Sequence, residues 1–172
     1  DDYQGIISLA EIERYKVRLA TRIDILPEFV RPGWLNPLLV VVPDGSDAPY
    51  QERFMTANIR EIRFVRLEDY YKPLQKIAQM SARVRNGFRL FQDNCLFCHS
   101  LKGIGGNKGV RLLESYDFSG SPGRERFMKD FSNFHNKDNA DKQNIEQFVS
   151  GDRLKDVAEF LLAVKSTVKN PR

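Results

Sequence analysis

The chain places both of its cysteines and one of its two histidines within five consecutive positions, Cys95-Leu96-Phe97-Cys98-His99. No other feature of the sequence restricts the fold as strongly, because one short turn must bring three reactive side chains together. Residues three apart lie on the same face of a helical turn, so the two thiols share a side and the histidine follows at once. The fold must therefore build a site around this turn.

The spacing CxxCH is the attachment signature of c-type haem. The two thiols add to the two vinyl groups of one porphyrin, and the adjacent imidazole is aimed at the iron. We therefore expect one covalently attached haem c, with thioether bonds at Cys95 and Cys98 and with His99 as the proximal iron ligand.

Three other uses of these residues stay open. Zinc could be bound by Cys95, Cys98, His99 and His135, although structural zinc sites usually draw on two separated pairs of ligands. A thioredoxin-like dithiol needs its cysteines at the start of a helix in a βαβ unit, whereas these follow a helical pattern. A disulfide between the two cysteines would close a tiny loop and stabilise little.

Composition and charge narrow the class of protein. Apolar residues make up 41% of the chain, which permits a packed core, and the longest apolar run, at 38–42, is far too short to span a membrane. Residues 1–79 carry 11 basic and 12 acidic side chains. Residues 80–172 carry 16 basic and 11 acidic side chains. Without a dense basic run we expect no nucleic-acid partner, and the basic second half favours docking to an acidic protein surface.

The first 72 residues have the pattern of short strands separated by turns. Expected strands, rich in β-branched and aliphatic residues, are 6–9, 16–23, 38–42 and 59–67. Proline and glycine residues at 31–37 and 43–49 predict turns between these strands. A β-rich domain of this size has a marginal core, so we expect it to depend on other contacts.

The second half has helical periodicity. Residues 73–79, with Pro73 as a rigid point, are expected to be a linker. Expected helices with apolar residues along one side are 80–91, 124–134 and 152–165, the last ending before Asn170-Pro171. A glycine-rich loop at 102–123 separates the first two.

Residues 80–172 resemble class I cytochrome c domains. Gly87 and Phe91 match the glycine and aromatic pair of that family's first helix, and CLFCH matches its attachment motif. GIGGNKG at 103–109 is similar to its glycine-rich loop, and VAEFLLAVK at 157–165 to its last helix, where Phe160 would cross near Gly87. The resemblance implies an all-α cytochrome c domain at 80–172. Together with the strand pattern of 1–72 and the linker at 73–79, this predicts an α+β chain with a small β-rich N-terminal domain.

Two departures from this family concern the iron ligands. The glycine-rich loop ends in Gly109-Val110 instead of Gly-Pro, although a backbone carbonyl there can still accept a hydrogen bond from the proximal imidazole. The usual distal Met-Pro aligns with Asn144-Ile145, so the usual sixth ligand is missing. His135 is the candidate distal ligand, Met128 is the alternative, and the position could also be open.

Residues 3–67 resemble the later portion of the molybdopterin-binding domain of sulfite-oxidase-like proteins. The similar segments are YQGIISLAEIERYKVRLATRID, GWLNPLLVVVPDG and IREIRFVRLEDYY. No cysteine is left to bind molybdenum, because both serve the haem. The resemblance implies a sheet without its cofactor, used for docking or scaffolding.

These observations predict a monohaem c-type cytochrome that transfers single electrons between redox protein partners, within a larger redox complex. We expect an electron-transfer protein rather than an enzyme, since no acid–base or nucleophile constellation appears. The alternatives are a haem enzyme or small-ligand sensor with an open distal site, and a subunit whose haem serves structure alone. The family resemblance implies a periplasmic location. Because the sequence begins without Met, a basic n-region or an apolar h-region, we expect a mature or trimmed product. We expect no transmembrane segment, and association with a membrane through a complex.

Overall fold

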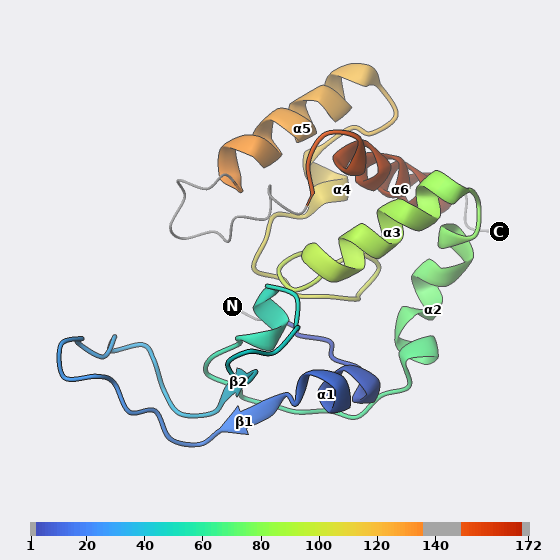
Figure 1. The fold of residues 1–172 in the computed structure, drawn as a ribbon. Coiled ribbons are helices and arrows are strands. Elements are labelled where there is room, and N and C mark those ends of the chain that lie inside the picture. Colours follow the sequence, from blue (N-terminus) through green and yellow to red (C-terminus); the bar gives the residue numbers. More distant parts are fainter. Residues whose placement is uncertain (1–2, 136–148, 170–172) are drawn as a thin grey trace. The chain divides into compact units, whose positions relative to one another are not determined.

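The computed structural model describes residues 3–135 and 149–169 of the chain. The chain forms two compact units. The helical unit consists of Asp1–Gln4 and Glu68–Arg172, and the N-terminal unit consists of Gly5–Leu67. Figure 1 traces the chain through both. None of the helices in the described ranges is long and apolar enough to span a membrane.

The helical unit is built from α-helices joined by loops. They are α2 (Leu67–Ala78), α3 (Ala82–Asn94), α4 (Leu112–Ser115), α5 (Ser121–Phe134) and α6 (Asp152–Lys169). The helices expected at 80–91, 124–134 and 152–165 are confirmed as α3, α5 and α6, with shifted ends. Asn170-Pro171 lies outside the described residues.

Local chemistry sets the start and the buried face of α3. The side chain of Ser81 caps the helix by accepting a hydrogen bond of 3.1 Å from the backbone N–H of Val84. Val84, Leu90 and Phe91 recur at helical spacing and are buried. The helix ends where Cys95 donates its backbone N–H to the carbonyl of Phe91, so α3 delivers the chain directly to the cysteine turn.

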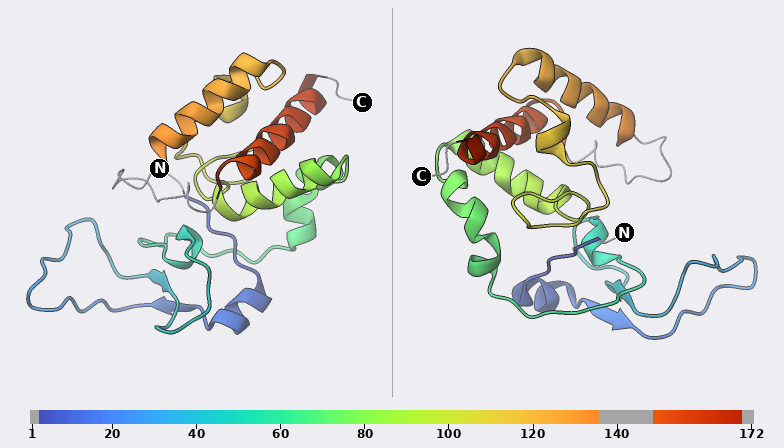
Figure 2. Two further views of the ribbon diagram at one scale, coloured as in Figure 1. Left: turned by 45° about the horizontal axis from the view of Figure 1, so that its top comes forward. Right: turned by 180° about the vertical axis from the view of Figure 1, so that it is seen from behind.

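Helices α3 and α6 cross in close contact, side by side in both views of Figure 2. Gly87 makes this approach possible, because a Cβ atom there would lie 2.0 Å from the carbonyl oxygen of Asp156 and 2.8 Å from Cβ of Phe160. The buried ring of Phe160 packs against those of Phe88 and Phe91, with centroids 5.4 and 5.8 Å apart. The expected crossing of Phe160 near Gly87 is confirmed.

The expected linker at 73–79 lies almost entirely within α2. Pro73 removes one helical hydrogen bond without ending the helix. The buried side chains of Tyr71, Leu74 and Ile77 recur at helical spacing, and their burial outweighs the missing bond. The prediction of a linker gave too much weight to the proline and too little to this periodicity.

The N-terminal unit has little regular structure. Its elements are α1 (Leu9–Tyr15), β1 (Arg18–Ala20), β2 (Leu39–Val41) and the 3₁₀-helix η1 (Glu52–Phe54). The two strands pair antiparallel, with Arg18 opposite Val41. Short strands therefore form inside the predicted ranges 16–23 and 38–42 only.

The strands expected at 6–9 and 59–67 are wrong. Ser8 caps α1 and forms a capping box with Glu11, which turns the first segment into a helix start. In the second segment Ile59 donates its N–H to the carbonyl of Leu38, but no ladder follows, and Phe64 is 87% exposed. Alternating apolar residues show which side a strand would bury, but they do not supply a partner strand.

Candidate functional site

The cysteine turn directly continues α3. The backbone N–H groups of Cys98 and His99 both donate to the carbonyl of Cys95, at 3.1 and 2.8 Å, and Leu96 is buried beneath the turn. Both cysteines are thiols and half-buried. The structure thus brings Cys95, Cys98 and His99 together in one tight turn, as the motif predicts.

The ring of His99 is fixed on one side by backbone. Its Nδ1 atom lies 2.9 Å from the carbonyl oxygen of Val110. A carbonyl can only accept a hydrogen bond, so the proton of the neutral imidazole is on Nδ1, and Nε2 keeps the lone pair that binds a metal. The departure from Gly-Pro in the loop therefore does not remove the carbonyl that orients this ring.

The same ring packs directly against the backbone of Gly109. A Cβ atom at this position would lie 2.4 Å from Nδ1 and Cε1 of His99 and 2.7 Å from Nε2, which no side chain could occupy. The backbone N–H of Gly109 also donates to the carbonyl of Cys98 at 2.7 Å. The chain thus holds an imidazole in a fixed orientation in the same turn as both cysteines, and these residue types fit a covalently attached haem.

The glycine-rich loop folds back on the cysteine turn at Gly105. This residue has φ +94°, and a Cβ atom there would lie 2.4 Å from the carbonyl oxygen of His99. The next residue, Gly106, donates its N–H to the carbonyl of Leu96 at 2.8 Å. The loop therefore braces the backbone that carries the motif.

A second brace comes from Tyr3, Gln4 and Tyr70, which we call the N-terminal clamp. The N–H of Gly105 donates to Tyr70 Oη at 3.0 Å and to Gln4 Oε1 at 3.1 Å, and the Tyr70 hydroxyl donates to the same amide oxygen. Gln4 donates its N–H to the carbonyl of Phe97 at 3.0 Å, and the Tyr3 ring stacks on the Phe97 ring with centroids 4.9 Å apart. The sequence contains no signal for this clamp, because its members are far from the motif along the chain.

His135 lies at the end of α5 and faces His99. The two ring centroids are 6.4 Å apart, with an angle of 71° between the ring planes. The backbone N–H of His135 donates to the carbonyl of Phe131 at 2.9 Å, and its ring lies 4.9 Å from that of Phe131. Its Nδ1 atom is buried. Packed rings continue from Phe131 to Phe127 and Phe118, which gives this side of the site an apolar wall.

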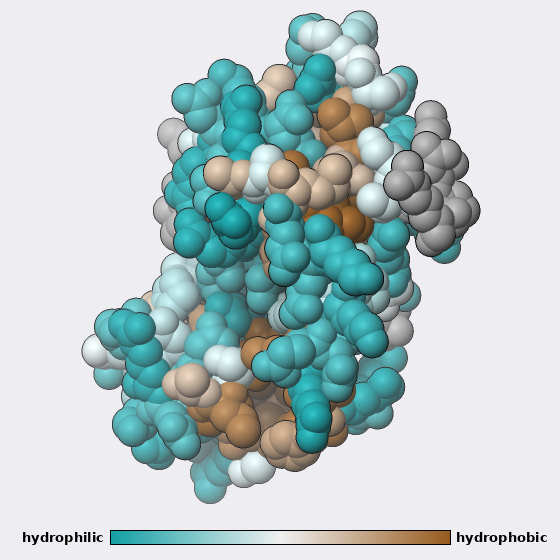
Figure 3. All heavy atoms as spheres, turned by 90° about the vertical axis from the view of Figure 1, so that its right-hand side faces the viewer, coloured by the Kyte–Doolittle hydropathy of each residue, from teal (hydrophilic) through white to brown (hydrophobic). Residues whose placement is uncertain are grey.

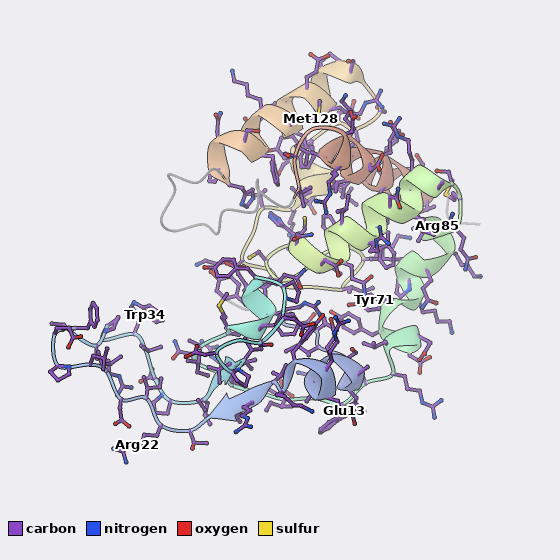
Figure 4. The ribbon with its side chains drawn as sticks, viewed as in Figure 1. Glu13, Arg22, Trp34, Tyr71, Arg85 and Met128 are labelled. Atoms are coloured by element: carbon purple, nitrogen blue, oxygen red, sulfur yellow. The ribbon has the colours of Figure 1, made fainter. Side chains whose placement is uncertain are left out.

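Met128, the alternative ligand, is half-buried on the same helix (Figure 4). It precedes His135 by seven residues, which corresponds to about 10 Å along a helix axis. Asn144-Ile145, which aligns with the usual Met-Pro, lies outside the described residues. Of the two candidates that are described, His135 has a ring contact with His99.

The competing uses of the cysteines receive little support. Burial raises the pKa of the Cys95 thiol to about 12, and the Asp93 carboxylate acts in the same direction, whereas a redox dithiol needs a lowered pKa. Within residues 3–135 and 149–169, no three histidine, cysteine or carboxylate side chains form a group that could hold a metal ion. The four residues of the zinc alternative all lie in these ranges.

The sequence model of a known family, described as Cytochrome c, matches residues 84–165. The match covers nearly all of α3, the cysteine turn, the glycine-rich loop, α5 and most of α6. No curated protein and no solved structure shows a significant match to the chain. The matched range leaves out residues 3–67, so the similarity of that segment to sulfite-oxidase-like domains stays a prediction.

Proposed function

Proceeding from the cytochrome c domain at residues 84–165, we propose that this chain binds a single covalent haem and passes single electrons between protein partners. The cytochrome c domain indicates haem-based electron transfer. The observation that carries the proposal is the seat of His99: its Nδ1 is held by the carbonyl of Val110 and its ring lies on Gly109, beside Cys98. With the proton on Nδ1, Nε2 would be the nitrogen that binds iron.

Each residue of the turn has a distinct role in the proposed site. Cys95 and Cys98 form the two thioether bonds, and His99 is the proximal ligand. The bound haem supplies a reversible one-electron change at iron. The chain's own residues orient the imidazole and surround the site with buried side chains, among them Leu96, Phe127 and Phe131. A fixed, apolar site changes little between redox states, which is what electron transfer requires.

Contacts with partners belong to the same proposal. The excess of basic side chains in residues 80–172 supports docking to an acidic surface on a redox protein. The N-terminal unit would act as a docking module within a larger complex, which its exposed Phe29, Val30 and Trp34 support. Trp34 projects from the loop between β1 and β2 (Figure 4). We place the protein in the periplasm, because covalent haem attachment takes place on the exported side of an energy-transducing membrane.

The test is expression in a bacterial host that matures c-type cytochromes. We expect haem colour that acid–acetone extraction does not remove, and a redox titration that follows a single one-electron curve. The double variant Cys95→Ala/Cys98→Ala should lose all covalent colour, while Ser100→Ala, next to the motif, keeps it. Colour that is extracted from the unmodified protein would contradict the proposal.

A further inference from the structure

We infer that His135 is the second axial ligand of the iron, so that the imidazoles of His99 and His135 occupy both axial positions. This inference rests on the proposed haem site at His99 and deepens it. It departs from the sequence pattern of class I cytochrome c domains, in which a methionine takes this position.

The separation of the two rings fits a shared metal ion. Two metal–nitrogen bonds of about 2 Å, with about 1 Å from each nitrogen to its ring centre, place the centroids about 6 Å apart. The centroids of His99 and His135 are 6.4 Å apart. The separation of the two rings therefore matches the one expected for two imidazoles bound to the same iron ion.

Both imidazoles are held by the protein instead of moving freely. Because the carbonyl of Val110 holds Nδ1 of His99, Nε2 is the nitrogen that this residue offers. His135 is tied to the end of α5 through its backbone N–H, and its ring is packed against Phe131. The angle of 71° between the ring planes is no obstacle, because two imidazoles on one iron need to share only the line of their metal–nitrogen bonds, at any angle between their planes.

The rival ligand on the same helix is poorly placed. Met128 lies two helical turns before His135, about 10 Å along the axis, so α5 would have to slide by that distance to exchange them. Residues 136–148 contain neither methionine nor histidine. His135 is the second histidine of the chain, and the sequence offers no third.

Closure by His135 has a functional consequence. Iron with two protein ligands has no position for an external molecule, which favours electron transfer over the alternative of a small-ligand sensor or peroxide enzyme. Replacement of methionine by a second imidazole also lowers the reduction potential, because methionine ligation raises it.

The experiment compares the full-length haem protein with His135→Ala, His135→Met and, as the matched control on α5, Met128→Ala. The unmodified protein and Met128→Ala should give low-spin spectra in both redox states, and neither should bind carbon monoxide when reduced. In His135→Ala the low-spin signal should be lost, carbon monoxide should bind at about one per haem, and added imidazole should restore the original spectrum. His135→Met should raise the reduction potential.

Two results would overturn the inference while leaving the proposed function intact. One is covalent haem in His135→Ala with an unchanged spectrum. The other is rapid carbon monoxide binding by the unmodified protein, which settles the matter even where the variant does not fold. An unmodified protein without covalent haem would instead refute the proposed function, and this inference with it.

Discussion

The two units differ in how much of their hydrophobic surface they bury. Among the described residues, every buried hydrophobic side chain except Phe54 belongs to the helical unit. In the N-terminal unit, Val30 is 92% exposed and Trp34 is 64% exposed. The face drawn in Figure 3 is hydrophilic over most of its area, and its hydrophobic side chains gather in a few patches.

This difference in burial means that the two units differ in how far they can be stable by themselves. The helical unit has a core of its own, centred on the crossing of α3 and α6, and the candidate haem site is built on that core. The N-terminal unit has a two-stranded sheet and one buried aromatic ring, which is too little for independent stability. We therefore expect the helical unit to respond sharply to single substitutions, and the N-terminal unit to gain order from contacts with a partner.

The largest effect is expected for Gly109→Ala. The added methyl group would overlap the His99 ring at 2.4 Å, and a ring held by the Val110 carbonyl cannot move away without losing that bond. We expect loss of correctly ligated haem, measured as the yield of covalent, low-spin protein.

The control for Gly109→Ala is Gly33→Ala in the N-terminal unit, where an added Cβ meets nothing within 4 Å. Its haem yield should equal that of the unmodified protein. A normal yield from Gly109→Ala would mean that the ring is not seated as described.

Next in size is the truncation of Phe160. Because this ring is fully buried between the side chains of Phe88 and Phe91, Phe160→Ala should cost about 4 kcal/mol of the free energy of unfolding. Denaturant titration followed by haem absorption gives this quantity for the helical unit.

The matching substitution in the N-terminal unit is Phe54→Ala. It should leave the haem-detected transition unchanged while making residues 5–67 more sensitive to limited proteolysis. Equal shifts of the haem-detected transition in Phe160→Ala and Phe54→Ala would show that the two units unfold together. That result would contradict the expected difference in their stability.

A smaller effect is expected for Tyr70→Phe in the N-terminal clamp. The variant loses the hydroxyl that accepts from Gly105 N–H, but Gln4 Oε1 remains as a second acceptor, so the loss should be about 1 kcal/mol. Hydrogen exchange at the Gly105 amide should become faster. Tyr50→Phe, on a side chain that is 58% exposed, serves as the control and should change neither quantity.

The smallest expected effect is the dependence of the stability of the N-terminal unit on pH, through the Glu11 carboxylate. Partial burial acts to raise the pKa of Glu11, but hydrogen bonds from Arg53 and Ser8 outweigh it, so the pKa lies below its ordinary value of 4.5. A lowered pKa means that the carboxylate stabilises the fold at pH values above 4.5, and that this contribution is lost as the pH falls through the folded-state value.

We expect this contribution to stay below about 1 kcal/mol, since the Glu11–Arg53 pair is partly exposed. Proteolysis rates of residues 5–67 should rise in acid, and Glu11→Gln should flatten that dependence. Glu13→Gln, on the exposed side of α1 (Figure 4), should not. If Glu11→Gln leaves the acid dependence intact, the pair with Arg53 is not its source.

The helical unit could largely be predicted from the sequence because its signals are local. Apolar periodicity located α3, α5 and α6, and the five-residue motif indicates the candidate site. Even the role of a backbone carbonyl after Gly109 could be expected, since it depends on chain geometry and not on the identity of Val110. Pro73 misled the prediction, because the cost of one lost hydrogen bond was smaller than the gain from buried neighbours.

The remaining features depend on residues that are far apart in the sequence. Alternation at 59–67 could not reveal that no strand among the described residues pairs with this segment. Nothing in the order of residues places Gln4 and Tyr70 on the N–H of Gly105, or His135 opposite His99. Such contacts are decided by tertiary packing, and a single sequence does not encode them in any local pattern.

The central claim is that haem is bonded to the chain through both cysteines of the turn. Trypsin should release residues 90–102 as one peptide, which contains Cys95, Cys98 and His99. In protein from a host that matures c-type cytochromes, mass spectrometry of this peptide should find the mass of the chain plus one haem, with no thiol left to alkylate. A peptide of bare mass with two alkylated cysteines would contradict the account.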